Sequence, residues 1–278
     1  ALDLAPQVAR TIAEKEIFEF VKENGGARSD LSTSTVDVFE IDLKFLGEFW
    51  TRSNRTDAAM EGAKLLPPIA IIGLVSSYDT FLASLLRVVL TLHPEIVLTS
   101  QKQIPFSELS QFTSIETARS TIINREIEAI LRKSHHDQFD WMQSHLNLKL
   151  KDGLDVWPKF VELCERRNLF THTGGIVSEQ YLRNCADHKC TLADMKPGQQ
   201  LSVGGTYFKS AVETIYEVGL KLCYVLWRKF EETEVDIADK DFNYRAMELI
   251  DGRSYSLAES LLKFSHRVHK IKDETRRM

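Results

Sequence analysis

The sequence predicts an all-α fold built from four to five long helices. Only 7 prolines and 13 glycines interrupt its 278 residues, which leaves long stretches free to form helices. Apolar residues recur in several of these stretches at the three- and four-residue spacing of an amphipathic helix. The chain shows no alternation of strands with helices, the pattern that would predict a parallel sheet. We therefore expect a helical bundle.

A helical extension is expected at the N-terminus, over residues 1–66. The segments with helical character are residues 8–23, 37–51 and 57–66. Asp37 has the side chain of a helix N-cap, although partial alternation in the second segment also permits a strand. Pro67 and Pro68 should end the third segment, because proline lacks the backbone N–H and its ring clashes with the preceding turn.

The bundle itself is expected over residues 67–235. Its central helix should be Ile69–Leu92, which is apolar on most faces. Asp79 lies midway along this helix, and because an unpaired buried carboxylate is costly, we expect it to have a partner. Its neighbour Tyr78 should pack in the core. Further helices are expected at residues 107–133, from Asp152 or Asp155 to Gly174, at 178–184 and at 206–232.

The C-terminal residues 236–278 are expected to form a helical hairpin. Within them, residues 242–264 (FNYRAMELIDGRSYSLAESLLKF) have a spacing of small and aromatic residues similar to that of a tetratricopeptide helix pair. A single pair of this kind cannot bury its faces alone. We therefore expect a hairpin that caps the bundle, and the alternative is the start of a repeat array.

Composition and charge narrow the class of protein. Lys and Arg total 35 against 40 Asp and Glu, a net charge of -5, which argues against a basic coat for nucleic acid but permits a local basic stripe. The four cysteines are too few and too irregular for a disulfide scaffold, and the longest apolar run, Leu65–Val75, is too short to span a membrane. We expect a cytoplasmic protein without a membrane segment. Its start at Ala1 and its charged end indicate a fragment of a longer chain.

One short motif carries chemistry. Residues 165–175 (ERRNLFTHTGG) contain Arg167, Asn168 and His172 in the pattern R-N-x-x-x-H, at the end of an amphipathic helix. Arg and His at this spacing are common by chance, so the asparagine gives the motif its weight. Residues 183–188 (RNCADH) repeat the pattern, which leaves open whether Arg183 and His188 are the functional pair instead.

The spacing of the first motif suits phosphate chemistry. On a helix, Asn168 and His172 share a face, and Arg167 lies about 100° to one side. We expect the three to line one edge of a pocket, where the planar guanidinium can fork around a phosphate. His172 lies in the last helical turn, where the helix dipole favours the imidazolium and the ring can exchange protons near neutral pH. Arginine and histidine together suffice for metal-free RNA cleavage.

The motif RNLFTH, at the end of a helix within a bundle of long helices, resembles the HEPN (higher eukaryotes and prokaryotes nucleotide-binding) superfamily over roughly residues 69–232. The resemblance implies a homodimer with a composite site, and a metal-independent endoribonuclease without cofactor that leaves 2',3'-cyclic phosphate ends. It implies that Arg167 binds the phosphate, His172 is the acid/base and Asn168 orients them, with Asp79 in support. It also implies a role in bacterial toxin, abortive-infection or antiviral systems, with an antitoxin or sensor as partner. Gly174 stands where one subfamily has a tyrosine that is nucleotidylated.

Further residues are candidates for binding the RNA substrate. Arg166 precedes the motif and Thr171 lies within it, and Arg125 and Arg132 belong to a basic stripe on the helix predicted at 107–133. Such a stripe could follow an RNA backbone. Glutamates interrupt it, so a solvated helix face is the alternative.

Two other interpretations remain open. Cys185, His188 and Cys190 could belong to a zinc site, with His172 as a distant fourth ligand, although the C-x(4)-C spacing is loose for zinc. The second interpretation is a non-catalytic helical module that presents a protein-interaction surface within a larger defence or regulatory protein. No phosphate-binding loop, dinucleotide-binding glycine motif or serine-hydrolase motif supports another class of enzyme.

Overall fold

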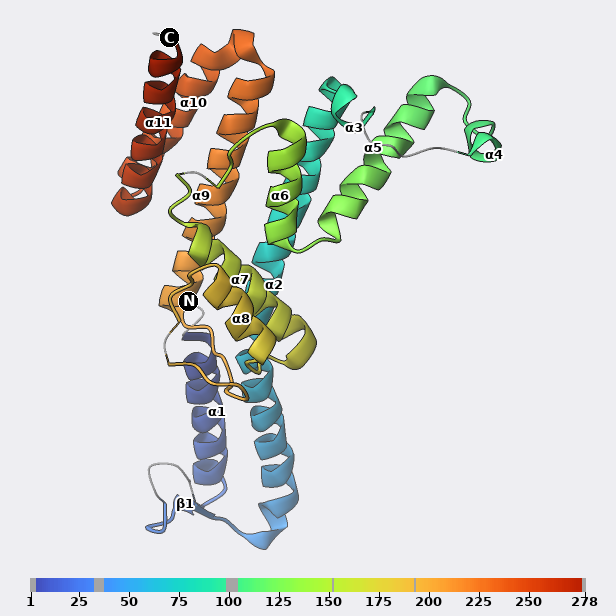
Figure 1. Cartoon of the computed structure of the whole chain (residues 1–278). Coiled ribbons are helices and arrows are strands. Elements are labelled where there is room, and N and C mark those ends of the chain that lie inside the picture. The colour runs from blue at the N-terminus through green and yellow to red at the C-terminus, as the bar shows by residue number, and fades with distance from the viewer. Residues whose placement is uncertain (1–3, 33–37, 99–104, 152, 193, 277–278) are drawn as a thin grey trace. The chain divides into compact units, whose positions relative to one another are not determined.

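The computed structural model describes residues 4–32, 38–98, 105–151, 153–192 and 194–276 (Figure 1). Within these ranges the chain forms eleven α-helices, two short 3-10 helices and one two-stranded antiparallel sheet, so the all-α prediction is confirmed. The chain divides into two compact units. The first comprises Ala1–Ile71 with Ser202–Lys209, and the second comprises Ile72–Leu201 with Ser210–Met278.

The first unit contains a helix, a small hairpin and the first half of a long helix. These elements are α1 (Leu4–Glu23), β1 (Ala27–Arg28), β2 (Phe39–Glu40), η1 (Leu43–Phe45) and the start of α2 (Leu46–Leu92). Ile17, Phe20 and Val21 form the buried face of α1. The residue proposed as an N-cap, Asp37, lies outside the described residues. Asp42 caps η1 by accepting a hydrogen bond from the backbone N–H of Lys44.

The prediction that Pro67 and Pro68 end a helix is wrong. Helix α2 runs for 47 residues from Leu46 to Leu92 with both prolines inside it. Each proline removes one backbone hydrogen bond, yet proline has the backbone φ of a helix. Pro67 is itself buried, and Ile71 and Val75 in the next turns are fully buried, so packing outweighs the lost hydrogen bonds.

The apolar character of α2 raises the question of a membrane. Leu43–Leu92 contains a window long and apolar enough to cross one, judged by length and composition, and 28% of that window is buried. In the second unit, one face of α2 is buried at helical spacing through Val75, Tyr78, Leu82 and Leu86. That arrangement is typical of the core helix of a folded domain.

The second unit holds the remaining helices. They are α3 (Glu95–Leu98), α4 (Phe106–Leu109), α5 (Ile115–Leu131), α6 (His135–Leu146), α7 (Trp157–Thr173), α8 (Glu179–Asp187), α9 (Gly205–Phe230), which begins in the first unit, η2 (Glu232–Glu234), α10 (Val235–Asp251) and α11 (Tyr255–Arg276). Aromatic rings fill the core between α2, α6 and α7. The ring centroids of Tyr78 and Phe160 are 5.0 Å apart, and those of Phe139 and Trp157 are 4.7 Å apart. Tyr78 is therefore a core residue, as predicted.

Two serine N-caps start helices at positions where the sequence analysis did not predict a helix start. The single helix expected over residues 107–133 is α4 and α5, because the Ser114 hydroxyl accepts a hydrogen bond from the N–H of Thr117 and starts α5 there. Helix α6 was not predicted at all. It starts where the Ser134 hydroxyl accepts from the N–H of Asp137, and it ends at Asn147, which has a left-handed backbone (φ 51°).

The C-terminal hairpin is present. Helices α10 and α11 lie side by side, joined by a short turn at residues 252–254 (Figure 1). Tyr224 of α9, Phe242 of α10 and Phe264 of α11 pack into one buried cluster. Ala246 in the same cluster is fully buried, as its small-residue position predicts. Whether the hairpin begins a repeat array remains a prediction.

Candidate functional site

Three charged or ionisable side chains converge where α2, α6 and α7 meet. Asp79 of α2 lies between His135 of α6 and Arg167 of α7. Its Oδ1 is 2.8 Å from Nε2 of His135, and its Oδ2 is 3.6 Å from Nη2 of Arg167. The side chains are 29%, 7% and 22% exposed, respectively. The expectation that Asp79 has a partner is confirmed, and one of its two partners belongs to the R-N-x-x-x-H motif.

This arrangement holds the guanidinium of Arg167 in a partly dry environment. A carboxylate midway along an apolar helix is costly unless paired, and here two neighbours share its charge. Nε of Arg167 is buried and has no hydrogen-bond partner among the described residues. The Asp79 carboxylate therefore orients the guanidinium and leaves part of its hydrogen-bonding capacity unused.

Aromatic side chains fix the position of His135. Its ring centroid is 6.0 Å from that of Tyr78 and 5.7 Å from that of Phe160, with the latter pair edge to face. Burial raises the pKa of Tyr78 well above its usual value, so its hydroxyl stays protonated. His135 is thus held between the rings of Tyr78 and Phe160 and contacts Asp79 through Nε2.

The end of α7 presents the other two residues of the motif. Gly174 ends the helix in a left-handed conformation (φ 62°), and its N–H donates to the carbonyl of Leu169. His172 is exposed in this last turn, and Asn168 is half-buried one turn earlier. Neither side chain makes a hydrogen bond or ion pair within the described part of the chain. Both are free to meet a ligand.

The expectation that all three residues line one pocket edge does not hold within one chain. Residues five apart on a helix lie about 140° apart around its axis. Arg167 accordingly turns toward Asp79, whereas His172 faces solvent. No hydrogen bond or ion pair joins Arg167 to His172 in the described residues.

The other two residues predicted to bind substrate near the motif, Arg166 and Thr171, make hydrogen bonds within the protein. Arg166 is buried, and its Nε donates to Oε1 of Glu162 at 2.7 Å. The same oxygen accepts a hydrogen bond from the hydroxyl of Tyr181 on α8, also at 2.7 Å. Arg166 therefore connects α7 with α8, a structural position rather than the substrate-binding one we predicted. Thr171 is exposed, and its hydroxyl donates to the carbonyl of Arg167 at 2.9 Å.

The predicted basic stripe lies on α5 and has acidic partners. Arg125 forms an ion pair with Glu108, and Arg132 lies 3.6 Å from Glu128 with its side chain 82% exposed. Among the described residues, neither arginine contacts Asp79, His135 or Arg167. This arrangement resembles a solvated helix face, the alternative stated above.

The three residues of the second copy of the motif, Arg183, Asn184 and His188, contact different parts of the protein. Arg183 is exposed and pairs with Glu179 of its own helix, while Nδ2 of Asn184 donates to Oε2 of Glu165 on α7 at 2.9 Å. His188 follows the end of α8, and its ring is tilted against that of His136, with the centroids 4.3 Å apart. Asn184 and His188 thus connect α8 with α7 and α6, and Arg183 pairs within its own helix, so the geometry favours the first copy as the site.

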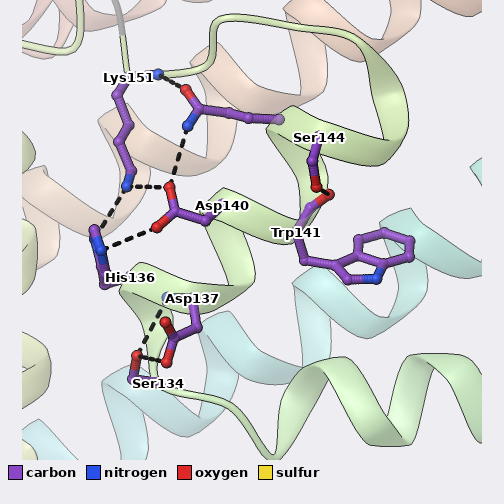
Figure 2. Close-up of polar contacts among 8 residues, drawn as sticks. Ser134, His136, Asp137, Asp140, Trp141, Ser144 and Lys151 are labelled. Carbon is purple, nitrogen blue, oxygen red and sulfur yellow. Dashed lines mark hydrogen bonds and ion pairs between the residues drawn. The ribbon is translucent and has the colours of Figure 1, made fainter.

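A second polar cluster lies on α6 (Figure 2). His136, Asp137 and Asp140 have ligand atoms within 4.8 Å of one another, the spacing of a metal site. However, the Lys151 ammonium donates to Asp140 Oδ1 at 2.6 Å and to His136 Nδ1 at 3.0 Å. Partial burial opposes ionisation of Asp140, but its hydrogen bond and charge interaction with Lys151 lower its pKa overall. An internal cation thus occupies the position that a metal ion would take.

Zinc binding by the cysteines of α8 finds no support in the geometry. Cys185, His188 and Cys190 do not bring three ligand atoms together in the part of the chain that the structure describes. Instead, His188 packs on His136 and on the ring of Trp157.

Sequence reasoning missed His135 as the main partner of Asp79. The two residues are 56 positions apart, and no local pattern joins them. The available signal was indirect, since a carboxylate in an apolar helix requires a partner and histidine is a common one. Comparisons with protein-family models, curated proteins and solved structures found no match for this chain, so the HEPN resemblance rests on the residues of the motif and on the helical fold.

Proposed function

We propose that the protein is a metal-independent endoribonuclease of the HEPN type, with Arg167 and His172 as its catalytic residues and Asn168 as their orienting neighbour. The observation that carries the proposal is the environment of Arg167 and His172 in the structure. Asp79 pairs with the guanidinium of Arg167, whose Nε has no hydrogen-bond partner among the described residues. His172 is exposed in the last turn of the same helix and likewise has no partner among those residues. A structural arginine and histidine at a helix end would be expected to bind the last carbonyls instead.

The chemistry requires a base, an acid and a cation. A histidine removes the proton of the ribose 2'-hydroxyl, whose oxygen attacks the adjacent phosphorus. The P–O5' bond breaks, and the departing oxygen takes a proton from an imidazolium. The products are a 2',3'-cyclic phosphate and a 5'-hydroxyl. Arg167 stabilises the negative charge that develops on the phosphorane oxygens.

The divergence of Arg167 and His172 on one helix supports a site made by two chains. Within one chain the two side chains point about 140° apart, so a phosphate that touches one does not reach the other without a second contribution. A homodimer related by a two-fold axis supplies each arginine with the histidine of the other copy. We further propose that this dimer acts in the cytoplasm as a toxin or antiviral effector under the control of an antitoxin or sensor.

The test is cleavage of total RNA by the purified protein in the presence of EDTA. We expect wild-type protein to produce 2',3'-cyclic phosphate ends, and Arg167→Ala and His172→Ala to lose at least about a hundredfold in rate. Arg55→Ala and His145→Ala are matched controls, since both residues are exposed and lie outside both copies of the motif. Equal cleavage by wild type and His172→Ala would overturn the proposal.

One observation favours the alternative, a non-catalytic interaction module. Helix α10 exposes Ile237, Tyr244 and Met247, which are each more than half exposed and share one face. Exposed apolar side chains grouped in this way are typical of protein-interaction surfaces. If the protein leaves RNA intact while Tyr244→Ser abolishes binding to a partner, the interaction module is the better description.

A further inference from the structure

The C-terminal end of α8 brings two cysteines together. Lys189 has a left-handed backbone (φ 57°), and its N–H donates to the carbonyl of Ala186 at 3.0 Å. The N–H of Cys190 donates to the carbonyl of Cys185 at 2.8 Å. This pair of hydrogen bonds forms a Schellman helix ending, in which the residue after the turn packs on a residue of the last helical turn. Here both of those residues are cysteines.

The two cysteines lie side by side at this turn and have different surroundings. The backbone hydrogen bond of 2.8 Å between them brings their side chains within reach of each other. Cys185 is fully buried, whereas Cys190 is only partly buried. The Cys190 thiol also contacts the carbonyl of Pro158, in the first turn of α7, at 3.1 Å.

These surroundings suit the two thiols to different roles, one as the attacking thiolate and the other as the thiol that completes the disulfide. The neighbouring thiol of Cys185, as a hydrogen-bond donor, lowers the pKa of Cys190, which makes its thiolate more available. The same hydrogen bond, together with burial, raises the pKa of Cys185. The accessible cysteine is therefore the better nucleophile, and the buried one is positioned to react with it.

We propose that Cys185 and Cys190 form a redox-active dithiol that peroxide oxidises to an intramolecular disulfide. The thiolate of Cys190 attacks one oxygen of hydrogen peroxide, the O–O bond breaks, and a sulfenic acid and water result after protonation of the leaving hydroxide. The sulfur of Cys185 then attacks the sulfenic sulfur, forms the S–S bond and releases a second water. Two thiols and one peroxide thus give one disulfide and two waters.

The other two cysteines differ in environment and serve as internal controls. Burial raises the pKa of Cys164 well above its usual value, and it also raises the pKa of Cys223. Neither contacts another thiol among the described residues. Both should remain reduced under conditions that oxidise the pair.

Oxidation has a structural consequence for α7. A disulfide removes the S–H that Cys190 directs at the Pro158 carbonyl, and it fixes the last turn of α8 to the loop that follows. The segment between the cysteines also carries His188, whose ring centroid lies 4.3 Å from that of His136 on α6. The dithiol therefore couples the redox state to contacts among α6, α7 and α8. It does not depend on the ribonuclease proposal.

The test exposes the full chain to one equivalent of hydrogen peroxide, alkylates the free thiols and digests with trypsin under non-reducing conditions. Trypsin cuts after Arg183 and Lys189, so the peptide Asn184–Lys189 and the peptide that starts at Cys190 stay joined only by a disulfide. We expect this linked pair, the loss of two alkylatable thiols per chain, and reversal by dithiothreitol. Alkylation of all four cysteines after peroxide, or a disulfide between separate chains, would overturn the proposal.

Variants separate the two roles. In Cys185→Ser, Cys190 should stop at the sulfenic acid, which dimedone traps. In Cys190→Ser, Cys185 should stay reduced, and Cys223→Ser should give the same linked peptides as wild type. Circular dichroism establishes that each variant folds. Dimedone labelling of Cys185 in preference to Cys190 would contradict the assignment of the nucleophile.

Discussion

Asp79→Asn tests the electrostatic arrangement around the motif most sharply. The change keeps the size of the side chain and removes its charge. His135, which is 7% exposed, loses a charged partner at 2.8 Å, and Arg167 loses one at 3.6 Å. A hydrogen bond to a charged group contributes about 1.5–3 kcal/mol, and partial exposure of Asp79 reduces the effect, so we expect the free energy of unfolding to fall by about 2 kcal/mol.

The two distances also predict how that loss divides between the partners. The contact with His135 is within hydrogen-bond range, whereas the contact with Arg167 is a longer ion pair between side chains that are each less than a third exposed. Double-mutant cycles should therefore give a coupling of about 1–2 kcal/mol between Asp79 and His135, and below about 1 kcal/mol between Asp79 and Arg167.

Urea unfolding followed by circular dichroism measures both quantities. The midpoint for Asp79→Asn should fall with an unchanged dependence on urea concentration. Asp155→Asn is a suitable control, because Asp155 is mostly exposed and contacts Arg267 at the surface. A loss below about 0.5 kcal/mol for Asp79→Asn, or a stronger coupling to Arg167 than to His135, would refute the reasoning.

Three further predictions concern stability. Gly175→Ala should cost about 3 kcal/mol in thermal or urea unfolding, because φ is +87° and the added Cβ would lie 2.7 Å from a phenyl ring. Gly174→Ala, at φ +62° with open space around it, should cost only about 1 kcal/mol, and equal losses would contradict the steric argument. Burial, with the positive charges of His136 and Lys151 nearby, lowers the pKa of His188. Its contribution to stability is therefore complete above the unfolded-state pKa of about 6.5 and is lost as the pH falls below that value. His188→Phe should lose less stability between about pH 7 and pH 5 than wild type, and an identical pH profile would count against this. Tyr181→Phe should cost about 1.5 kcal/mol by removing a buried hydrogen bond of 2.7 Å, whereas Tyr216→Phe at an exposed position should cost less than about 0.5 kcal/mol.

The helix that carries the motif was predictable because its signals are local. Apolar positions recur at helical spacing up to Leu169, and a glycine pair follows at the point where the backbone turns left-handed. Other boundaries depend on a balance between local and tertiary terms. Pro67 argues locally for a helix end, but its burial within α2 outweighs that preference.

Helix α6 and the environment of the motif were harder to predict from the sequence. The buried face of α6 includes two polar residues, His135 and Gln138, and the start of the helix depends on one hydroxyl, that of Ser134. The need of Asp79 for a partner could be inferred from its apolar surroundings, but the identity of His135 could not, because long-range pairing leaves no periodic signal. The spacing fixes the angle between Arg167 and His172, but which of the two faces Asp79 depends on the side of α7 that the core covers.

Complementation between two inactive variants tests the central claim most directly. Arg167→Ala and His172→Ala proteins are mixed in equal amounts, allowed to exchange subunits, and assayed for RNA cleavage in EDTA. Random pairing makes about half of the dimers mixed, and each mixed dimer has one complete site of two, so we expect about a quarter of the wild-type rate. A mixture as inactive as its separate components, beside an active wild-type protein, would contradict a site shared between Arg167 of one chain and His172 of the other.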